Sequence, residues 1–240
     1  MKNYKRIAII PARGGSKRLP RKNIIDFYGK PIIFWTIKAA VESNIFDDVF
    51  VSTEDEEIKK ISKKYSCKVL NRLSSLATDS ATIVEVILSH LKELNSIGKV
   101  YDYIYCLYPT APLRNKNDLI NISNIFEKQT NVDSVIAVTN FSHYPFQALK
   151  INDKKNIEPF WPEYISKRST DLPNLVAGNG STYAVKTDLF LKYKSFLLPK
   201  NNYAYEMQSW KSLDLDNYED LILLESIILK KPELLENLEG

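Results

Sequence analysis

The stretch from Ile9 to Asn23, IIPARGGSKRLPRKN, places two adjacent glycines and five basic side chains directly after an apolar run. Glycine permits the unusual dihedral angles and the close approach that a phosphate-binding loop requires. The backbone N–H groups that would cradle phosphate oxygens are those of Gly14, Gly15 and Ser16. The spacing matches neither a Walker loop nor a G-x-G-x-x-G fingerprint, so a solvated basic turn is the competing interpretation.

The basic side chains of this stretch differ in the chemistry they offer. Arg13 presents a planar fork for phosphate, while Lys17 and Lys22 act as mobile point charges. This division suits a flexible triphosphate. Because the stretch follows the first expected strand of the chain, its position favours a phosphate site over a solvated turn.

Asp214 and Asp216, in SLDLDNYEDL, form the second feature that could carry chemistry. We expect a strand there, whose period of two would point both carboxylates to one face. Two like charges held together require a cation, and oxygen ligands completed by phosphates are typical of Mg²⁺. Asp216 or Asn217 could instead cap the following helix, which leaves Asp214 unexplained. A basic phosphate loop with a carboxylate pair predicts metal-assisted transfer at a nucleoside triphosphate.

The elements that must position these residues follow from the hydrophobic pattern. Strands are expected at residues 6–10, 47–53, 67–70, 101–108 and 133–141, and helices at 31–43, 55–65 and 81–94. This alternation predicts an α/β fold: a three-layer, doubly wound, mostly parallel sheet of the Rossmann-like nucleotidyltransferase type. Ligands bind beyond the carboxyl ends of such strands, so the loops at 11–23, 53–55 and 109–114 should approach one another.

Length and composition favour one domain over residues 1–240. Within it, residues 142–179 are aromatic, proline-bearing and weakly periodic, as expected of an excursion that forms an oligomer contact. The formal charge of +4 is too balanced for a surface that wraps a polyanion, which argues against a nucleic-acid partner. Without a signal-like N-terminus or a long apolar run, we expect a cytoplasmic protein with no membrane partner.

Six motifs occur in order over nearly the whole chain: IAIIPARGGSKRLPRKN, VFVSTEDEEI, ATDSAT, YPTAPLR, NGSTYAV and SLDLDNYEDL. In this order they resemble the CMP-nonulosonate synthetases, or acylneuraminate cytidylyltransferases, which are related to the Kdo cytidylyltransferases. The resemblance implies an enzyme that joins CTP to a nine-carbon 2-keto sugar acid, releasing pyrophosphate and forming the CMP-sugar. The alternatives are a Kdo or other sugar nucleotidyltransferase and a non-catalytic nucleotide- or nucleic-acid-binding protein.

The resemblance also implies roles for individual residues. Catalytic roles fall on Arg13, Lys22, Asp214 and Asp216, of which Asp214 and Asp216 would hold Mg²⁺. The triphosphate loop would use Arg13, Ser16, Lys17, Lys22 and Asn23, in addition to the glycine backbone. The cytidine would contact Arg72, Ala81 and Thr82. From its surroundings alone, Arg72 would be an exposed arginine after a strand.

The remaining implied residues concern the sugar acid. Asn179 and Tyr183 match a sugar-site strand, and Arg168 matches a basic residue contributed by the partner subunit of a homodimer. Tyr108 stands where sialic acid enzymes commonly have glutamine, and Gln147 stands where they have lysine. Both departures resemble the pseudaminic acid branch of the family, with legionaminic acid as the alternative substrate.

Overall fold

The computed structural model describes residues 4–235 of the chain. The strands are β1 (Arg6–Pro11), β2 (Asp26–Phe27), β3 (Lys30–Pro31), β4 (Asp48–Thr53), β5 (Lys68–Asn71), β6 (Tyr103–Leu107), β7 (Ser134–Asn140), β8 (Leu149–Ile151), β9 (Ile157–Pro159), β10 (Val176–Lys186) and β11 (Asn202–Glu206). The α-helices are α1 (Ile33–Glu42), α2 (Glu56–Lys64), α3 (Ile83–Ser96), α4 (Lys116–Lys128), α5 (Thr187–Tyr193) and α6 (Tyr218–Lys230).

The central sheet has the strand order β11-β7-β10-β6-β1-β4-β5. Neighbouring strands run parallel except at β10, which lies antiparallel between β6 and β7. The buried strands β1 and β6 are apolar runs, as expected of strands covered on both faces. The predicted doubly wound, mostly parallel α/β sheet is therefore confirmed.

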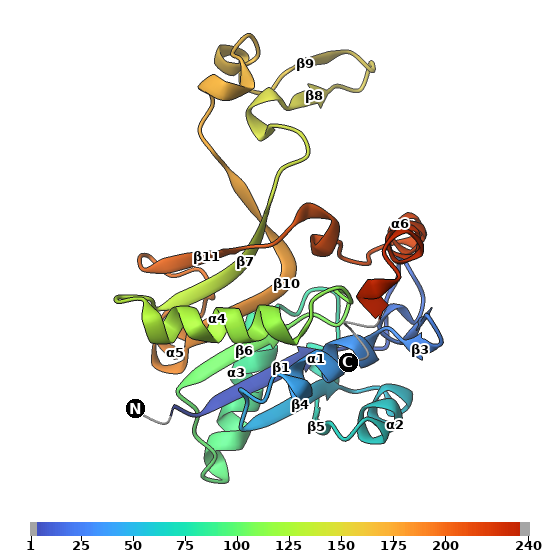
Figure 1. Cartoon of the computed structure of the whole chain (residues 1–240), viewed down its shortest axis with the longest axis vertical. Coiled ribbons are helices and arrows are strands. Elements are labelled where there is room, and N and C mark those ends of the chain that lie inside the picture. The colour runs from blue at the N-terminus through green and yellow to red at the C-terminus, as the bar shows by residue number, and fades with distance from the viewer. Residues whose placement is uncertain (1–3, 236–240) are drawn as a thin grey trace.

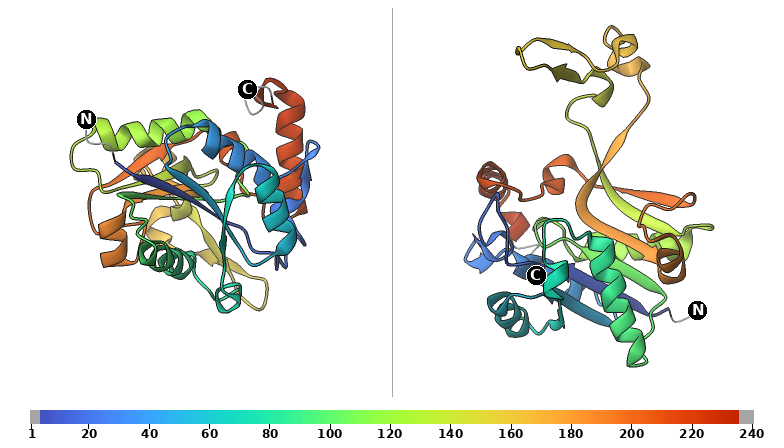
Figure 2. Two further views of the ribbon diagram at one scale, coloured as in Figure 1. Left: turned by 90° about the horizontal axis from the view of Figure 1, so that it is seen from below. Right: turned by 180° about the vertical axis from the view of Figure 1, so that it is seen from behind.

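Helices cover both faces of the sheet (Figure 2). On one face, α1 and α4 contribute Ile33, Ile37, Leu119 and Ile122 to a buried apolar cluster. On the other face, α3 and α5 contribute side chains such as Leu91 to a second cluster. A third cluster lies under α6 and joins that helix to the segment that follows β1. Burial on both faces fixes the sheet as a rigid support for the loops at its edge.

Polar side chains mark where several helices begin. Each accepts a hydrogen bond from a backbone N–H of the first helical turn, which satisfies donors that the helix leaves unpaired. These N-cap residues are Asp55 for α2, Thr82 for α3, Asn115 for α4 and Asn217 for α6. These N-caps fix the residue at which each loop ends and its helix begins. Asn217, rather than Asp216, caps α6.

Residues 141–175, here called the arm, connect β7 to β10 and project away from the layered body (Figure 1). The arm carries the β8–β9 hairpin and a group of packed aromatic rings formed by Phe146, Phe160, Trp161 and Tyr164. It coincides with most of the excursion expected at 142–179. The last residues of that excursion instead belong to β10, which returns the chain to the sheet.

The strand expected around Asp214 is a correction to the sequence interpretation. The chain there forms a short 3₁₀ helix, η6 (Ser209–Ser212), and then an extended segment without a strand partner. The backbone N–H of Leu215 donates to the carbonyl oxygen of Thr110 at 2.9 Å, which anchors the segment beside the loop after β6. Within residues 4–235, no helix is long and apolar enough to cross a membrane.

Candidate functional site

A cavity of about 270 Å³ lies where the loops after β1, β5 and β6 meet. It brings together many of the residues that the sequence predicted for one site: Arg13, Ser16, Lys17, Lys22, Asn23, Arg72, Ala81, Tyr108 and Asp216. The loops after β1 and β4 also touch, because the Gly14 N–H donates to Glu54 Oε1 at 2.8 Å. The predicted approach of these loops at the carboxyl edge of the sheet is confirmed.

Gly14 and Gly15, in the loop after β1, were expected to offer free backbone N–H donors to phosphate, and the structure differs from this expectation. A Cβ atom on Gly14 would lie 2.4 Å from Asp55 Oδ2, so the close packing of this turn requires glycine. The N–H of Gly14 is already engaged by Glu54, and the N–H of Ser16 donates to the Gly14 carbonyl oxygen at 3.2 Å. Gly15 has open space around it. A nest of free backbone donors is therefore not preformed.

The basic side chains of the loop after β1 that line the cavity are paired with carboxylates of the protein. Asp79 pairs with Arg13 and Lys17, with one carboxylate oxygen at 2.6 Å from each. Because a guanidinium and an ammonium share this carboxylate, the pKa of Asp79 lies below its usual range. Asp79 therefore joins Arg13 and Lys17 beside the cavity.

Asp216 is a second carboxylate that pairs with basic side chains of the same loop. Asp216 Oδ1 lies 2.8 Å from Lys22 Nζ and 2.9 Å from an Arg18 guanidinium nitrogen. Partial burial works against ionisation of Asp216, but the hydrogen bonds from these cations keep its pKa below the usual range. Lys22 thus already faces the carboxylate pair that the sequence assigned to a metal.

Two further side chains brace the loop. Arg21, in the left-handed region at φ 57°, turns away from the cavity and forms a two-pronged pair with Asp55 at 2.5 and 3.1 Å. It also reaches Glu57 at 2.6 Å. Asn23 is buried and donates to the Arg13 carbonyl oxygen at 2.8 Å, so it fixes the loop backbone beneath Arg13.

Arg72 also lines the cavity and is only 7% exposed, so the expectation of an exposed arginine is wrong. Its Nε donates to the Leu76 carbonyl oxygen at 2.8 Å. Burial lowers the pKa of Arg72, and the nearby Glu54 carboxylate opposes that effect. A buried guanidinium held at one edge can present its remaining N–H donors to a planar polar group.

The two residues predicted beside Arg72 have different surroundings. Ala81 lines the cavity. Thr82 is the N-cap of α3, where its hydroxyl accepts from the Glu85 N–H at 3.2 Å and donates to Glu85 Oε2 at 2.8 Å. This capping box uses the Thr82 hydroxyl within the protein. Thr82 is not among the cavity-lining residues.

Asp214 lies next to the loop that carries Thr110 and is the most perturbed carboxylate of the site. Its Oδ1 is buried and has no hydrogen-bond partner among the described residues. Burial raises the pKa of Asp214 to about 6, and a hydrogen bond from Thr110 opposes the rise. A Cβ atom on Gly180, whose φ is +67°, would lie 3.0 Å from Asp214 Oδ2, so glycine makes room for this carboxylate.

The predicted sugar-site residues of the body lie together beside Asp214. The rings of Tyr108 and Tyr183 pack edge to face with centroids 6.0 Å apart, and burial raises the pKa of both hydroxyls. Asn179 is buried, with its amide donating to Ser212 Oγ at 3.0 Å and its carbonyl accepting from the Ser181 N–H at 3.1 Å. Asn179 therefore holds the irregular part of β10, whose register shifts between Gly178 and Tyr183.

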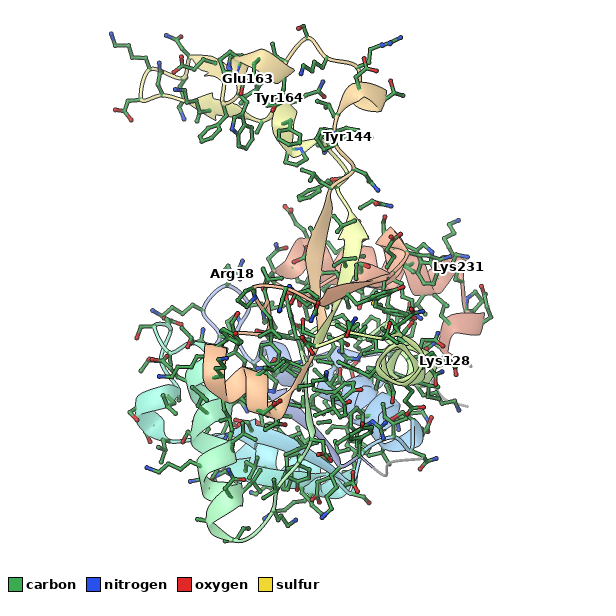
Figure 3. The ribbon with its side chains drawn as sticks, turned by 90° about the vertical axis from the view of Figure 1, so that its left-hand side faces the viewer. Arg18, Lys128, Tyr144, Glu163, Tyr164 and Lys231 are labelled. Carbon is green, nitrogen blue, oxygen red and sulfur yellow. The ribbon has the colours of Figure 1, made fainter. Side chains whose placement is uncertain are left out.

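Gln147 and Arg168 are not brought to the cavity of the same chain. Both lie on the arm, where Gln147 donates to the Lys167 carbonyl oxygen at 3.1 Å and Arg168 pairs with Asp171 at 3.1 Å. The Arg168 side chain is 83% exposed. Figure 3 shows the arm, labelled at Tyr144, standing clear of the body. Any contribution of these residues to a site must come from another arrangement of chains.

Arg114 is a residue whose importance the sequence interpretation missed. It is completely buried and donates to the Ser181 carbonyl oxygen and to Thr36 Oγ1, both at 2.6 Å, and to the Tyr108 carbonyl oxygen at 3.3 Å. Burial lowers the pKa of Arg114 to about 10. It therefore ties the loop that carries Tyr108 to β10 and α1. Its position at the end of YPTAPLR was the available signal.

Three other residues of the site also lay inside quoted motifs without receiving a role. They are Glu54 in VFVSTEDEEI, Asp79 in ATDSAT and Thr110 in YPTAPLR. Asp79 pairs with Arg13 and Lys17, Glu54 accepts from the Gly14 N–H, and Thr110 hydrogen-bonds Asp214; none of these partners can be read from the motif that contains the residue.

Comparison with known proteins gives a consistent result. A family model described as "Cytidylyltransferase" matches residues 7–236 of the chain. The chain is 37% identical over 221 residues to the pseudaminic acid cytidylyltransferase of Campylobacter jejuni subsp. jejuni serotype O:2, covering 90% of this chain and 93% of that protein. It is 35% identical over 220 residues to the N-acylneuraminate cytidylyltransferase of Streptococcus agalactiae serotype III, covering 91% of this chain and 52% of that protein.

Among solved structures, the chain resembles a CMP:2-keto-3-deoxy-manno-octonic acid synthetase complexed with CTP. The TM-score is 0.70 at 15% sequence identity, and the match covers 95% of this chain and 99% of that chain. At this identity the likeness concerns the fold alone.

Proposed function

Because the chain belongs to the cytidylyltransferase family, and is therefore a CTP-dependent enzyme that activates a nonulosonic acid, we propose that its sugar substrate is pseudaminic acid. The observation that carries the proposal is the meeting of a cationic loop and the Asp216 carboxylate at one cavity, which is also lined by Tyr108 of the Tyr108–Tyr183 pair. The 37% identity to a relative named for pseudaminic acid supports the choice of sugar.

In the proposed reaction, the anomeric hydroxyl oxygen of the sugar acid forms a bond to the α-phosphorus of CTP. The bond from that phosphorus to the oxygen bridging the β-phosphate breaks, pyrophosphate leaves with the electron pair, and the proton of the attacking hydroxyl passes to water. Arg13, Lys17 and Lys22 would bind the triphosphate, because positioned cations stabilise the charge that develops on the leaving group. The backbone of Gly14, Gly15 and Ser16 would contribute after local rearrangement, and Asn23 would keep the loop in shape.

The cytidine would lie in the same cavity, against Arg72 and Ala81. Arg72 presents buried N–H donors suited to the carbonyl group of the base, and Ala81 offers a small surface beside it. Thr82 would act through the backbone, since its hydroxyl is used in the α3 cap.

Asp214 and Asp216 are the residues that would hold Mg²⁺, which when bound supplies Lewis-acid polarisation of the phosphate and of the attacking hydroxyl. Their chemistry fits the ion, since Asp214 Oδ1 is a buried oxygen without a partner among the described residues. No group of three His, Cys, Asp or Glu side chains within residues 4–235 could hold a metal alone. Substrate phosphate oxygens would complete the shell, as is usual for Mg²⁺.

We propose that the enzyme acts in the cytoplasm as a homodimer in which the arm reaches the partner's site. The arm exposes several large apolar side chains, and groups of exposed apolar side chains often mark interaction surfaces. The exposed side chains are Leu149, Ile151, Ile157, Phe160 and Ile165. In such a dimer, Arg168 and Gln147 would extend toward the sugar bound beside Tyr108, Asn179 and Tyr183 of the other chain. A guanidinium is well suited to bind the carboxylate of the sugar acid.

The proposal is tested by pyrophosphate release from CTP and Mg²⁺ with pseudaminic, legionaminic, N-acetylneuraminic and Kdo acids supplied separately. We expect clear preference for pseudaminic acid, and we expect Tyr108→Gln to weaken that preference in favour of N-acetylneuraminate while Tyr108→Phe retains it. Preference of the unmodified enzyme for another nonulosonic acid would contradict the choice of sugar. Turnover with Kdo alone would contradict the branch of the family.

A further inference from the structure

Asp79 is a carboxylate of the cavity wall that is paired with two cations of the loop after β1. Both oxygens of Asp79 are occupied, one by Arg13 and the other by Lys17, each at 2.6 Å. Asp79 itself lines the cavity together with these two cations. A bound triphosphate would therefore compete with Asp79 for the same donors.

The loop that carries Asp79 does not depend on its carboxylate for shape. Thr78 and Ser80 join their hydroxyls at 3.1 Å, and the Ala81 N–H donates to Thr78 Oγ1 at 3.2 Å. These bonds on either side of Asp79 define the turn that leads into α3. The Asp79 carboxylate instead contacts Arg13 and Lys17 of the loop after β1.

The Asp79 side chain is 46% exposed, and Lys17 is 81% exposed. Ion pairs at such exposure are weak and exchange readily, because water and salt screen them. A ligand with several negative charges can thus displace the carboxylate, whereas a ligand with little charge gains less from doing so. The arrangement favours polyphosphates over less charged ligands.

We infer that Asp79 is a specificity-determining residue that competes with the triphosphate of the nucleotide for Arg13 and Lys17, so that only ligands rich in phosphate charge displace it. The inference rests on the proposed function, in which these cations bind CTP. The same competition has a second consequence. After the reaction, Asp79 can pair again with Arg13 and Lys17 in place of pyrophosphate, which favours release of the product.

The test is equilibrium binding of CTP and of pyrophosphate, without sugar acid, to the wild-type chain and to Asp79→Asn. The substitution keeps the size of the side chain and removes the competing charge. We expect both ligands to bind about 3- to 10-fold more tightly, in keeping with weak exposed ion pairs. Pyrophosphate should also become a stronger inhibitor of turnover by a similar factor.

Asp188→Asn is the matched control, because it removes the same charge from the exposed surface of α5, away from the cavity. It should leave both affinities unchanged. Unchanged or weaker binding by Asp79→Asn, with a folded protein by circular dichroism, would overturn the inference while leaving the proposed function intact. A wild-type chain that binds neither CTP nor pyrophosphate would overturn the proposed nucleotide site and the inference with it.

Discussion

Asp214 is held by the fold in surroundings that disfavour its charged form. Its Oδ1 is buried without a partner among the described residues, and burial raises its pKa to about 6. An unfolded chain would return this carboxyl to a pKa of about 3.9. Because the folded value is the higher one, the protonated carboxyl favours folding below about pH 4, and that stability is lost as the pH rises through 6.

We therefore expect Asp214→Asn to be more stable than the wild type at pH 8 by about 1 to 3 kcal/mol, measured by urea unfolding without divalent cations. The difference should disappear toward pH 4. Turnover should fall by at least about 100-fold, because the proposed metal loses a charged ligand.

Asp216→Asn is the control for this prediction. Lys22 and Arg18 already hold the pKa of Asp216 low, so removing its charge should leave stability unchanged or reduced at pH 8. Near-normal turnover of Asp214→Asn with Mg²⁺ would contradict the metal assignment. A loss of stability at pH 8 would contradict the account of its burial.

At this scale, the sequence predicted which residue types meet but not how they are paired. The carboxylate pair and the basic loop could be identified because their chemistry is specific. The bond made by the Gly14 N–H and the burial of the Arg114 guanidinium could not be predicted, because both depend on hydrogen-bond partners from distant segments of the chain. Neither Glu54 nor Ser181 shows in its own surroundings that it accepts such a bond.

Between elements, the phosphate loop is joined to α2 by Arg21 and Asp55. The hydrogen bonds from the Arg21 guanidinium hold the pKa of Asp55 at about 2, against about 3.9 in an unfolded chain. Because the folded value is the lower one, this stability is present above about pH 4 and is lost as the pH falls toward 2.

Asp55→Asn keeps a good N-cap for α2 and removes only the charge. We expect it to destabilise the fold at pH 7 by about 1 to 2 kcal/mol, after allowance for solvent screening, and the difference should shrink below about pH 4. Urea unfolding at several pH values measures it. Glu57→Gln removes a more exposed carboxylate from the same arginine and should have little effect; an equal effect of both would contradict the special place of Asp55.

The elements themselves were largely predictable from hydrophobic period. The expected strands and helices up to β7 are present, because each buries an apolar run or stripe in the layered core. β11 was missed, since most of its side chains are exposed at the edge of the sheet and give no apolar run. The strand expected at Asp214 was wrong, because one hydrogen bond from Leu215 to Thr110 holds that segment without a ladder.

At the scale of the whole molecule, the proposed dimer predicts that two inactive variants can restore activity when they are mixed, which a monomer could not do. Arg168→Ala and Asp214→Asn should each be nearly inactive alone. If Arg168 serves the partner's site, mixing and reassociating equal amounts of the two should restore about a quarter of wild-type turnover, because half of the dimers then hold one intact site. The rate of pyrophosphate release before and after mixing measures it.

If Arg168 served its own chain, every site in the mixture would still carry one defect and no activity would return. A monomeric, fully active wild-type protein in analytical ultracentrifugation would contradict the dimer altogether. Lys167→Ala, one residue away on the same exposed arm, is the control that should remain active alone.

The antiparallel strand β10 has a consequence for how the chain is made. β6 leaves the ribosome with one edge already able to pair with β1, but its other neighbour is β10, which is synthesised only after α4, β7 and the entire arm. Throughout that interval an apolar strand edge remains open, a state that invites association with other nascent chains. The late arrival of β10 therefore covers the open edge of β6 and joins β7 to the sheet, after which only β11 remains to be added at the edge of β7.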